Sequence, residues 1–289
     1  MRFDYTTVGH VTVDVMADGT RRPGGGAFYS ALQAARLGRR TLIVTRGVRE
    51  EIEQLLSPYA EELTLEVHEA QCTTTLATVG RGRGRSQRVL AWAGELTAEL
   101  AIDTEILHLA PVARETDGRS HGRAAFVGVT PQGLVRSWSQ SDGQIVPRAL
   151  DRSLLPADCD AIVISEAERD SCATLLEAAQ SEATDVEQGR RADEPVIAVT
   201  HGEAPTELRL PDGTTLRVEV PAVGRMCDDI GAGDVFAAAF FIALADGKNP
   251  RLAAQFANAA AAVRVAASGA SAVGDRAAID ARIARVASP

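Results

Sequence analysis

Short runs of β-branched and other apolar residues alternate along the chain with Ala- and Leu-rich stretches whose apolar positions recur with a helical period. This alternation predicts an α/β protein, a three-layer α/β/α sandwich with a mostly parallel central sheet and helices on both faces. Nearly continuous apolar runs are typical of strands that are buried on both sides. The expected strands are 6–8, 41–45, 106–109, 125–129, 161–164 and 196–200.

Three helices have clear end signals. One is expected over 27–37, where apolar residues share one face and Gly38 can take the left-handed C-terminal conformation. Two strong helices are expected to close the chain. The first spans 233–247, and the second follows Asn249 as N-cap with Pro250 in its first turn.

Two segments interrupt the α/β rhythm. Residues 64–93 read as strand, turn and strand, which predicts a small antiparallel β flap, or lid, outside the main sheet. Its tip carries Arg81, Arg83 and Arg85, which could attract an anionic ligand or simply form a solvated hairpin end. The polar stretch 182–195 is expected to be a surface loop.

Charge and composition narrow the function classes. The chain has 289 residues, a formal net charge of −9 and a pI near 5.2, which is untypical of proteins that bind nucleic acid or anionic membranes. Neither a leader nor a membrane-spanning apolar run is evident, so a cytoplasmic protein is expected. The four cysteines lack the spacing of a zinc site or a disulfide framework.

The stretch "DDIGAGD" (228–234) carries the clearest chemistry. Its glycines permit tight backbone turns, and the amides of Gly231, Ala232 and Gly233 would point out of a helix start, where they favour an anion. Asp234 beside them could accept a proton from a substrate hydroxyl while the amides hold a phosphoryl group. The alternative is an ordinary helix start, with Asp228 or Asp229 near the cap and Asp234 complementing the helix dipole.

The whole segment 228–263, "DDIGAGDVFAAAFFIALADGKNPRLAAQFANAAAAV", resembles the closing signature of the ribokinase-like family, also called the PfkB family of carbohydrate kinases. The resemblance implies that Asp234 is the catalytic base and that Gly231, Ala232 and Gly233 form the anion hole. It also implies that Asp228 lies near the nucleotide and its cations, and Asn258 near the adenine.

The opening signature of that family is similar to "PGGGAFYSALQAARLG" (23–38). By this resemblance the backbone of Gly24, Gly25 and Gly26 lies against the substrate, and Asp14 binds its hydroxyl groups. Asp14 could instead be an exposed acid at a strand end. Tyr29 stands where many sugar kinases of the family have an asparagine, so it is expected either to contact the substrate or to pack in the core.

Two further motifs resemble the family with departures. "ISEAERD" (164–170) places Glu168 where the family has a glutamate that orders magnesium through water, with Ser165 in place of an asparagine. "VTHGEAP" (199–205) places Thr200 and Gly202 at a nucleotide-lining turn, with Pro205 in place of a glycine.

A narrower likeness concerns the substrate. "ILHLAPV" (106–112), "FVGVTPQGLVRSW" (126–138) and "GGAFYSAL" (25–32) look like the myo-inositol-kinase-like branch. This likeness makes Gln132 and Arg136 candidate substrate contacts, although both could be ordinary loop residues.

The resemblance predicts a single ribokinase-like domain over 1–289, with a lid from roughly 10–24 and 64–93. It implies an ATP- and Mg²⁺-dependent kinase acting on a hydroxyl of a small sugar or polyol, with K⁺ dependence left open and a homodimer through the lid as an option. Nucleoside or ketose phosphorylation and a non-catalytic ligand-binding homologue are the alternatives. Neither a P-loop nor a GxSxG motif occurs in the sequence.

Overall fold

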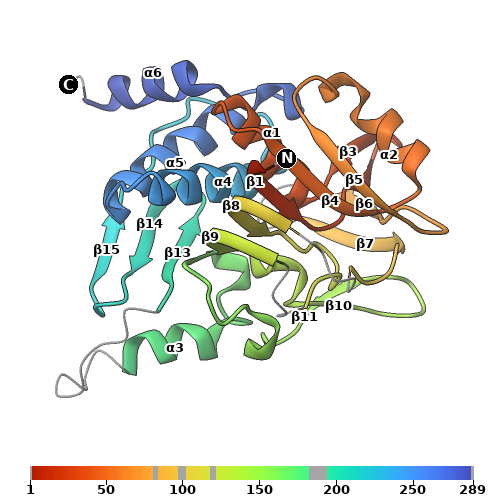
Figure 1. Cartoon of the computed structure of the whole chain (residues 1–289), viewed down its shortest axis with the longest axis horizontal. Helices are drawn as coiled ribbons and strands as arrows, with labels where there is room; N and C mark the ends of the chain where they lie inside the picture. Colours follow the sequence, from red (N-terminus) through yellow and green to blue (C-terminus); the bar gives the residue numbers. More distant parts are fainter. Residues whose placement is uncertain (1, 81–83, 97–101, 118–121, 182–193, 288–289) are drawn as a thin grey trace.

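The computed structural model describes residues 2–80, 84–96, 102–117, 122–181 and 194–287, and a nine-stranded sheet forms its centre (Figure 1). The strand order is β15-β14-β13-β12-β9-β8-β1-β4-β5. All neighbours run parallel except β13–β14 and β14–β15, so the mostly parallel sheet is confirmed. The strands are β1 (Phe3–Val8), β4 (Thr41–Gly47), β5 (Thr64–Glu69), β8 (Ile102–Leu109), β9 (Gly122–Val129), β12 (Ala161–Ser165), β13 (Val196–His201), β14 (Ala204–Arg209) and β15 (Thr215–Val218).

Helices cover both faces of this sheet, which confirms the three-layer arrangement (Figure 1). Along β12, Ala161 and Val163 join the core under helices α1, α4 and α5, whereas Ile162 and Ile164 join the core that includes α3. This alternation is why the strands are apolar at nearly every position. The helices are α1 (Gly26–Arg36), α2 (Arg49–Leu56), α3 (Ala173–Ser181), α4 (Ala232–Ala245), α5 (Pro250–Val265) and α6 (Arg276–Ala287).

Two of the predicted helix ends agree with the structure. Asn249 caps α5 by accepting a hydrogen bond from the Leu252 amide at 2.9 Å, and Gly247 has the positive φ of 80° expected after α4. The expectation that two helices close the chain is wrong, because α6 follows them. Its sequence mixes arginines with alanines, and only the side chain of Ile279 among its described residues is fully buried, so its apolar period is weak.

A separate four-stranded sheet forms the lid, with strand order β3-β2-β6-β7. The predicted lid range 64–93 needs a correction. Its first part is β5, which pairs with β4 at the edge of the main sheet, because a local strand pattern does not reveal which sheet a strand joins. The lid strands are β2 (Thr12–Met16), β3 (Arg21–Gly24), β6 (Thr75–Val79) and β7 (Ser86–Ala91). The Arg81 and Arg83 tip and most of the predicted 182–195 loop lie outside the described residues.

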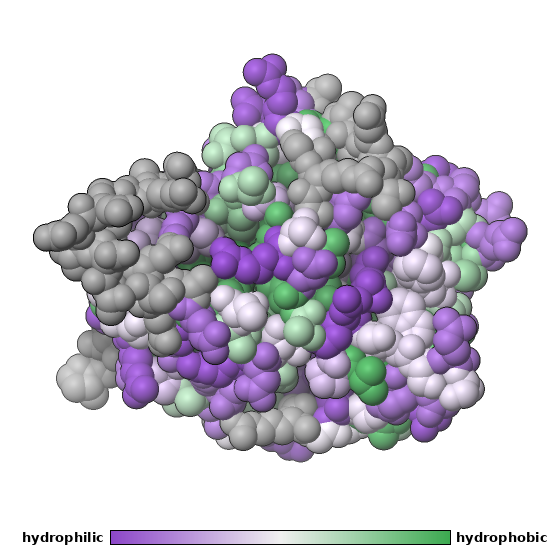
Figure 2. Space-filling view, turned by 90° about the horizontal axis from the view of Figure 1, so that it is seen from below, coloured by the Kyte–Doolittle hydropathy of each residue, from purple (hydrophilic) through white to green (hydrophobic). Residues whose placement is uncertain are grey.

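Next to the lid, a short hairpin of β10 (Arg136–Trp138) and β11 (Ile145–Pro147) packs through Trp138 against Trp92, with ring centroids 5.7 Å apart. Figure 2 shows hydrophilic and hydrophobic residues interspersed on one face of the molecule. Within the described ranges, none of the helices combines the length and the apolar character needed to cross a membrane.

Candidate active site

The candidate site lies at one edge of the main sheet. Strands β1, β8, β9, β12 and β13 are parallel, so their carboxyl ends meet at the same edge, where open α/β sheets bind ligands. The ends of β9, β12 and β13 and the segments after them carry Gln132, Arg136, Glu168, Thr200 and Gly202. The other predicted site residues lie on lid strands β2 and β3, on helices α1 and α5, and in the loop and first turn of α4.

The loop before α4 carries the three amides predicted to form an anion hole, and the Ala232 amide donates to the Asp229 carbonyl oxygen at 3.3 Å. Gly231 is the N-cap with φ 76° and ψ 2°, a left-handed conformation that favours glycine. A Cβ there would lie 2.3 Å from the ring of Tyr29. Gly233 is exposed, and a Cβ there would meet nothing within 4 Å. Amides in the first turn of a helix lack intrahelical partners, so this open side can receive an anion.

Asp234 follows directly in the first turn of α4. A Cβ on Gly26 would lie 2.9 Å from Asp234 Oδ1, so the carboxylate reaches the backbone at the start of α1. Burial, and secondly the nearby Glu168 carboxylate, raise the pKa of Asp234 to about 6, against the lowering effect of Arg136 and Arg85. A carboxylate with this pKa is largely ionised at neutral pH and can accept a proton.

Asp14 is buried on lid strand β2 and faces the glycine run. Its Oδ1 accepts a hydrogen bond from Thr12 Oγ1 at 2.8 Å, and a Cβ on Gly24 would lie 2.4 Å from its carboxyl group. Gly25 has φ 91°, and a Cβ there would lie 2.2 Å from the carbonyl oxygen of His10. Burial raises the pKa of Asp14 to about 6. The glycines are therefore needed for the close approach of backbone and carboxylate.

Arg136 brings a positive charge from the segment after β9. Its guanidinium donates to the Val112 carbonyl and to Gln87 Oε1, both at 3.0 Å, so it links the main domain to the lid. Burial lowers the pKa of Arg136, and the surrounding carboxylates oppose that shift. Gln132 is half-buried in the preceding turn Pro131–Gly133.

Glu168 and the β13 turn lie along the same edge. Glu168 Oε2 accepts a hydrogen bond from the Ser165 amide at 2.7 Å, which leaves its other oxygen for a further partner. Thr200 Oγ1 donates to the Ile164 carbonyl at 3.4 Å, and Gly202, with φ 66°, is exposed. Among the described residues, no three His, Cys, Asp or Glu side chains gather as a metal site.

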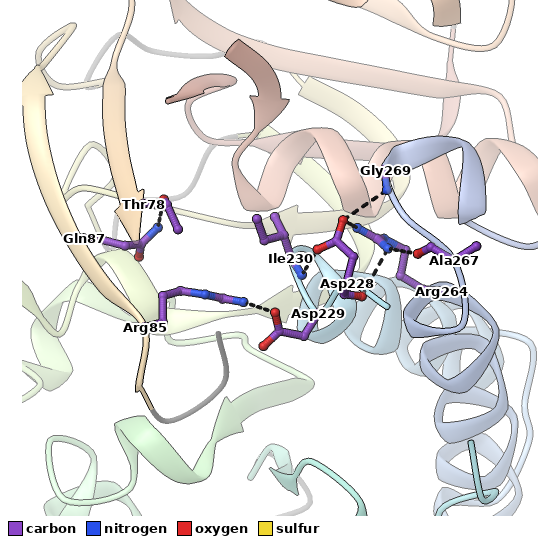
Figure 3. Close-up of polar contacts among 9 residues, drawn as sticks. All are labelled: Thr78, Arg85, Gln87, Asp228, Asp229, Ile230, Arg264, Ala267 and Gly269. Atoms are coloured by element: carbon purple, nitrogen blue, oxygen red, sulfur yellow. Dashed lines mark hydrogen bonds and ion pairs between the residues drawn. The ribbon is translucent and has the colours of Figure 1, made fainter. Parts of the chain in front are cut away.

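Asp228 is bonded inside the protein (Figure 3). Its carboxylate accepts hydrogen bonds from the amides of Ile230 and Gly269, each at 3.0 Å, and pairs with Arg264 at 3.1 Å. Burial alone would raise the pKa of Asp228, but these partners outweigh it, and the pKa lies below its usual value. The carboxylate therefore holds the loop, and its predicted nucleotide contact stays a prediction.

Asn258 is also bonded inside the protein. Its Oδ1 accepts from Thr206 Oγ1 at 2.8 Å, and its Nδ2 donates to the carbonyl oxygens of Val218 and Glu219 at 3.3 and 3.1 Å. These bonds tie α5 to the β14–β15 edge of the sheet. A role beside an adenine would therefore rest on the position of the backbone that Asn258 fixes.

Tyr29 packs beneath the anion-hole loop. Its side chain is buried between Gly231 and the guanidinium of Arg264, which lies 5.4 Å from the ring centroid. Burial raises the pKa of Tyr29 to about 12. This is the geometry of the packing alternative, and a contact with substrate stays a prediction.

Three residues near the site have contacts that the sequence pattern does not predict. Arg264 is fully buried and bonded to Asp228, although an arginine in a helix is usually exposed. Glu115 is fully buried and accepts from the amides of His10, Val112 and Ala113 at 2.7–2.8 Å. Arg85, left open between a ligand contact and a solvated tip, pairs with Asp229 at 2.5 Å (Figure 3).

Known proteins share this architecture. A pyrophosphate-dependent kinase of the ribokinase family, complexed with a pyrophosphate analog and myo-inositol, is 21% identical with a TM-score of 0.74, covering 96% of this chain and 99% of that chain. Ribokinase from Arabidopsis thaliana, complexed with ribose and ATP, is 17% identical with a TM-score of 0.70, covering 98% and 99%. Nucleoside kinase from Methanocaldococcus jannaschii is 16% identical with a TM-score of 0.70 and the same coverage.

At these identities the likeness shows a shared fold. The family itself is shown by a sequence model, described as pfkB family carbohydrate kinase, that matches residues 1–276. The chain therefore belongs to the pfkB family of carbohydrate kinases.

Proposed function

We propose that the protein transfers the terminal phosphoryl group of ATP to a hydroxyl group of a small sugar or polyol, with myo-inositol as the first candidate. Membership of the pfkB family supports a sugar or polyol kinase. The observation that carries the proposal is Asp234, an ionisable carboxylate in the first turn of α4, beside the open amide side of Gly233 and against Gly26.

In the proposed reaction Asp234 takes the proton of the attacking hydroxyl. Asp14 and the backbone of 24–26 orient that hydroxyl, which then forms the new O–P bond as the bond to the leaving diphosphate breaks. The amides of Gly231, Ala232 and Gly233, with the helix dipole of α4, stabilise the negative charge on the phosphoryl oxygens.

Two arginines add positive charge to this region. Arg136 and Arg85 both lower the pKa values of Asp14 and Asp234, so both guanidinium groups lie within electrostatic range of the two carboxylates. Arg85 Nε is buried and has no hydrogen-bond partner among the described residues. We expect Arg85 to donate to the phosphoryl group in transfer, since a guanidinium matches phosphate oxygens well.

Magnesium would bind mainly through the phosphates of its donor and through water, which is its usual mode in kinases. The oxygen of Glu168 that does not bond Ser165 suits such a water-mediated contact. When bound, the ion would neutralise the phosphate charge that the amides share.

Pyrophosphate is a second candidate donor. Three of the structural neighbours are described as pyrophosphate-dependent kinases, whereas others are ribokinases and a nucleoside kinase. Asn258 uses its side-chain amide inside the protein, which leaves it little to offer an adenine. We propose ATP as the phosphoryl donor, and the experiment below tests pyrophosphate against it.

The test is a matrix of donors and acceptors. Purified protein with Mg²⁺ is given ATP or pyrophosphate together with myo-inositol, other polyols, ribose, ketoses or nucleosides, and the phosphorylated product is measured by mass spectrometry. We expect product from a polyol with ATP. Product only with pyrophosphate overturns the donor, product only from a nucleoside or ketose overturns the acceptor, and ligand binding without any product supports the non-catalytic homologue.

A homodimer through the lid is part of the proposal. Val79 and Leu90, on neighbouring lid strands, are 56% and 57% exposed, which is high for large apolar side chains. Light scattering of the protein and of Leu90→Glu tests this surface. A dimer that persists in the variant would place the interface elsewhere.

A further inference from the structure

Arg264 occupies an unusual environment behind the anion hole. It lies near the end of α5, and its side chain is fully buried. Its NH1 group donates to the carbonyl oxygens of Asp228 and Ala267 at 3.3 and 3.2 Å, and its NH2 group bonds Asp228 Oδ2 at 3.1 Å (Figure 3). One buried guanidinium is therefore held by a carboxylate and two carbonyl groups.

These ligand types are the ones that hard cations prefer. Carboxylate and carbonyl oxygens bind alkali and alkaline-earth ions in proteins. Without the guanidinium, the same three oxygens would converge on a buried space that carries a negative charge. A buried charge without a partner lowers the free energy of unfolding, so a cation in this space would stabilise the protein.

The guanidinium is also linked to the anion hole. Asp228 Oδ1 accepts the Ile230 amide, which precedes Gly231, and Oδ2 accepts the Gly269 amide. On its other side the guanidinium lies against Tyr29, whose ring supports Gly231. The guanidinium therefore fixes Gly231, which has φ 76°, through two separate contacts, one through Asp228 and one through Tyr29.

We infer that Arg264 is a built-in cation, a positioning residue whose guanidinium replaces a monovalent metal ion beside Asp228 and makes the loop independent of K⁺. The residues around Asp228 therefore do not fit K⁺ as a resident cofactor, because the chain already supplies the charge. The inference rests on the proposed function for its kinetic readout only.

The first test needs no variant. Thermal unfolding of the protein is followed in KCl and in choline chloride at equal ionic strength. We expect the same midpoint in both salts, and the same rate of product formation with the acceptor that the panel identifies. A midpoint that rises in KCl alone would overturn the inference, because it would show that K⁺ still stabilises the protein although Arg264 is present. This unfolding result stands even if the protein phosphorylates nothing.

The second test removes the guanidinium. Arg264→Ala should lower the unfolding midpoint by about 10 °C in choline chloride, since it leaves a buried carboxylate unpaired. KCl, or guanidinium chloride below denaturing concentration, should restore about 5 °C when it exceeds its dissociation constant about 100-fold. Arg264→Lys keeps the charge and should respond to neither salt.

A folded Arg264→Ala variant that loses stability but gains nothing from K⁺ or guanidinium would show that the side chain acts by packing. If that variant does not fold in any salt, K⁺-sensitive stability of Arg264→Lys or of the unaltered protein would also overturn the inference.

Discussion

Asp228 and Asp229 are neighbours in the loop before α4, yet they face different parts of the molecule (Figure 3). Asp228 bonds the fully buried Arg264 and two backbone amides, all within the main domain. Asp229 bonds Arg85 of the lid, in a pair whose side chains are 26% and 18% exposed. The loop therefore has a side fixed by the core and a side connected to the lid, and the phosphoryl group is proposed to bind between them.

Asp234 follows this loop in the first turn of α4 and is the proposed catalytic base, so its replacement should have the largest effect on activity. Asp234→Asn should lower kcat by about 10³-fold, because the amide cannot accept the hydroxyl proton. Donor binding, measured by calorimetry, should stay nearly unchanged. Asp246→Asn, at the other end of α4 and paired with Arg39, is the matched control and should keep its activity. Turnover of Asp234→Asn at the parental rate would refute the base assignment.

The two neighbouring acids should differ in stability. Asp228→Asn should lower the free energy of unfolding by about 3 kcal/mol, because it leaves a buried guanidinium uncompensated. Asp229→Asn should lower it by about 1 kcal/mol or less, as is usual for a partly exposed pair. Urea denaturation measures both. Equal losses would mean that the lid side is as firmly built as the core side.

Arg85 should affect turnover more than stability. Arg85→Gln should lower kcat about tenfold if its guanidinium contacts the phosphoryl group, since one lost charged donor costs at least that much in comparable sites. Its free energy of unfolding should change by less than about 1 kcal/mol. Arg88→Gln is the control, because Arg88 is an exposed arginine of β7, the strand that begins directly after Arg85. Equal effects of both variants would make the Arg85 pair with Asp229 a surface contact only.

The sequence predicts the start of α4 better than it predicts the buried contacts that fix the loop before it. Asp234, Gly231 and the α4 start could be predicted because their spacing is local and their chemistry is carried by the residue types themselves. Arg264 could not, because helical periodicity assigns an arginine to the exposed face, and its acidic partner lies 36 residues away. The placement of β5 failed for a related reason, since strand pairing depends on distant residues.

The lid and α4 should both contribute to the pH dependence of activity, because burial raises the pKa values of Asp14 on the lid and of Asp234 on α4 to about 6. Asp234 must be ionised to accept the hydroxyl proton, and Asp14 accepts the stronger, charge-assisted hydrogen bond when it is ionised, so kcat/KM should rise with pH through about 6 and then level off. Arg136 lowers both pKa values, so Arg136→Gln should move this rise to higher pH whichever carboxyl controls it.

Glu168 separates the two carboxyls. After burial, its carboxylate is the main group that raises the pKa of Asp234, whereas burial raises the pKa of Asp14 and Thr12, Arg136 and Arg85 lower it. Glu168→Gln should therefore move the rise in kcat/KM to lower pH if Asp234 controls it, whatever happens to the maximal rate. A rise that stays in place in Glu168→Gln, yet moves in Arg136→Gln, would assign the controlling ionisation to Asp14 and hence to the lid.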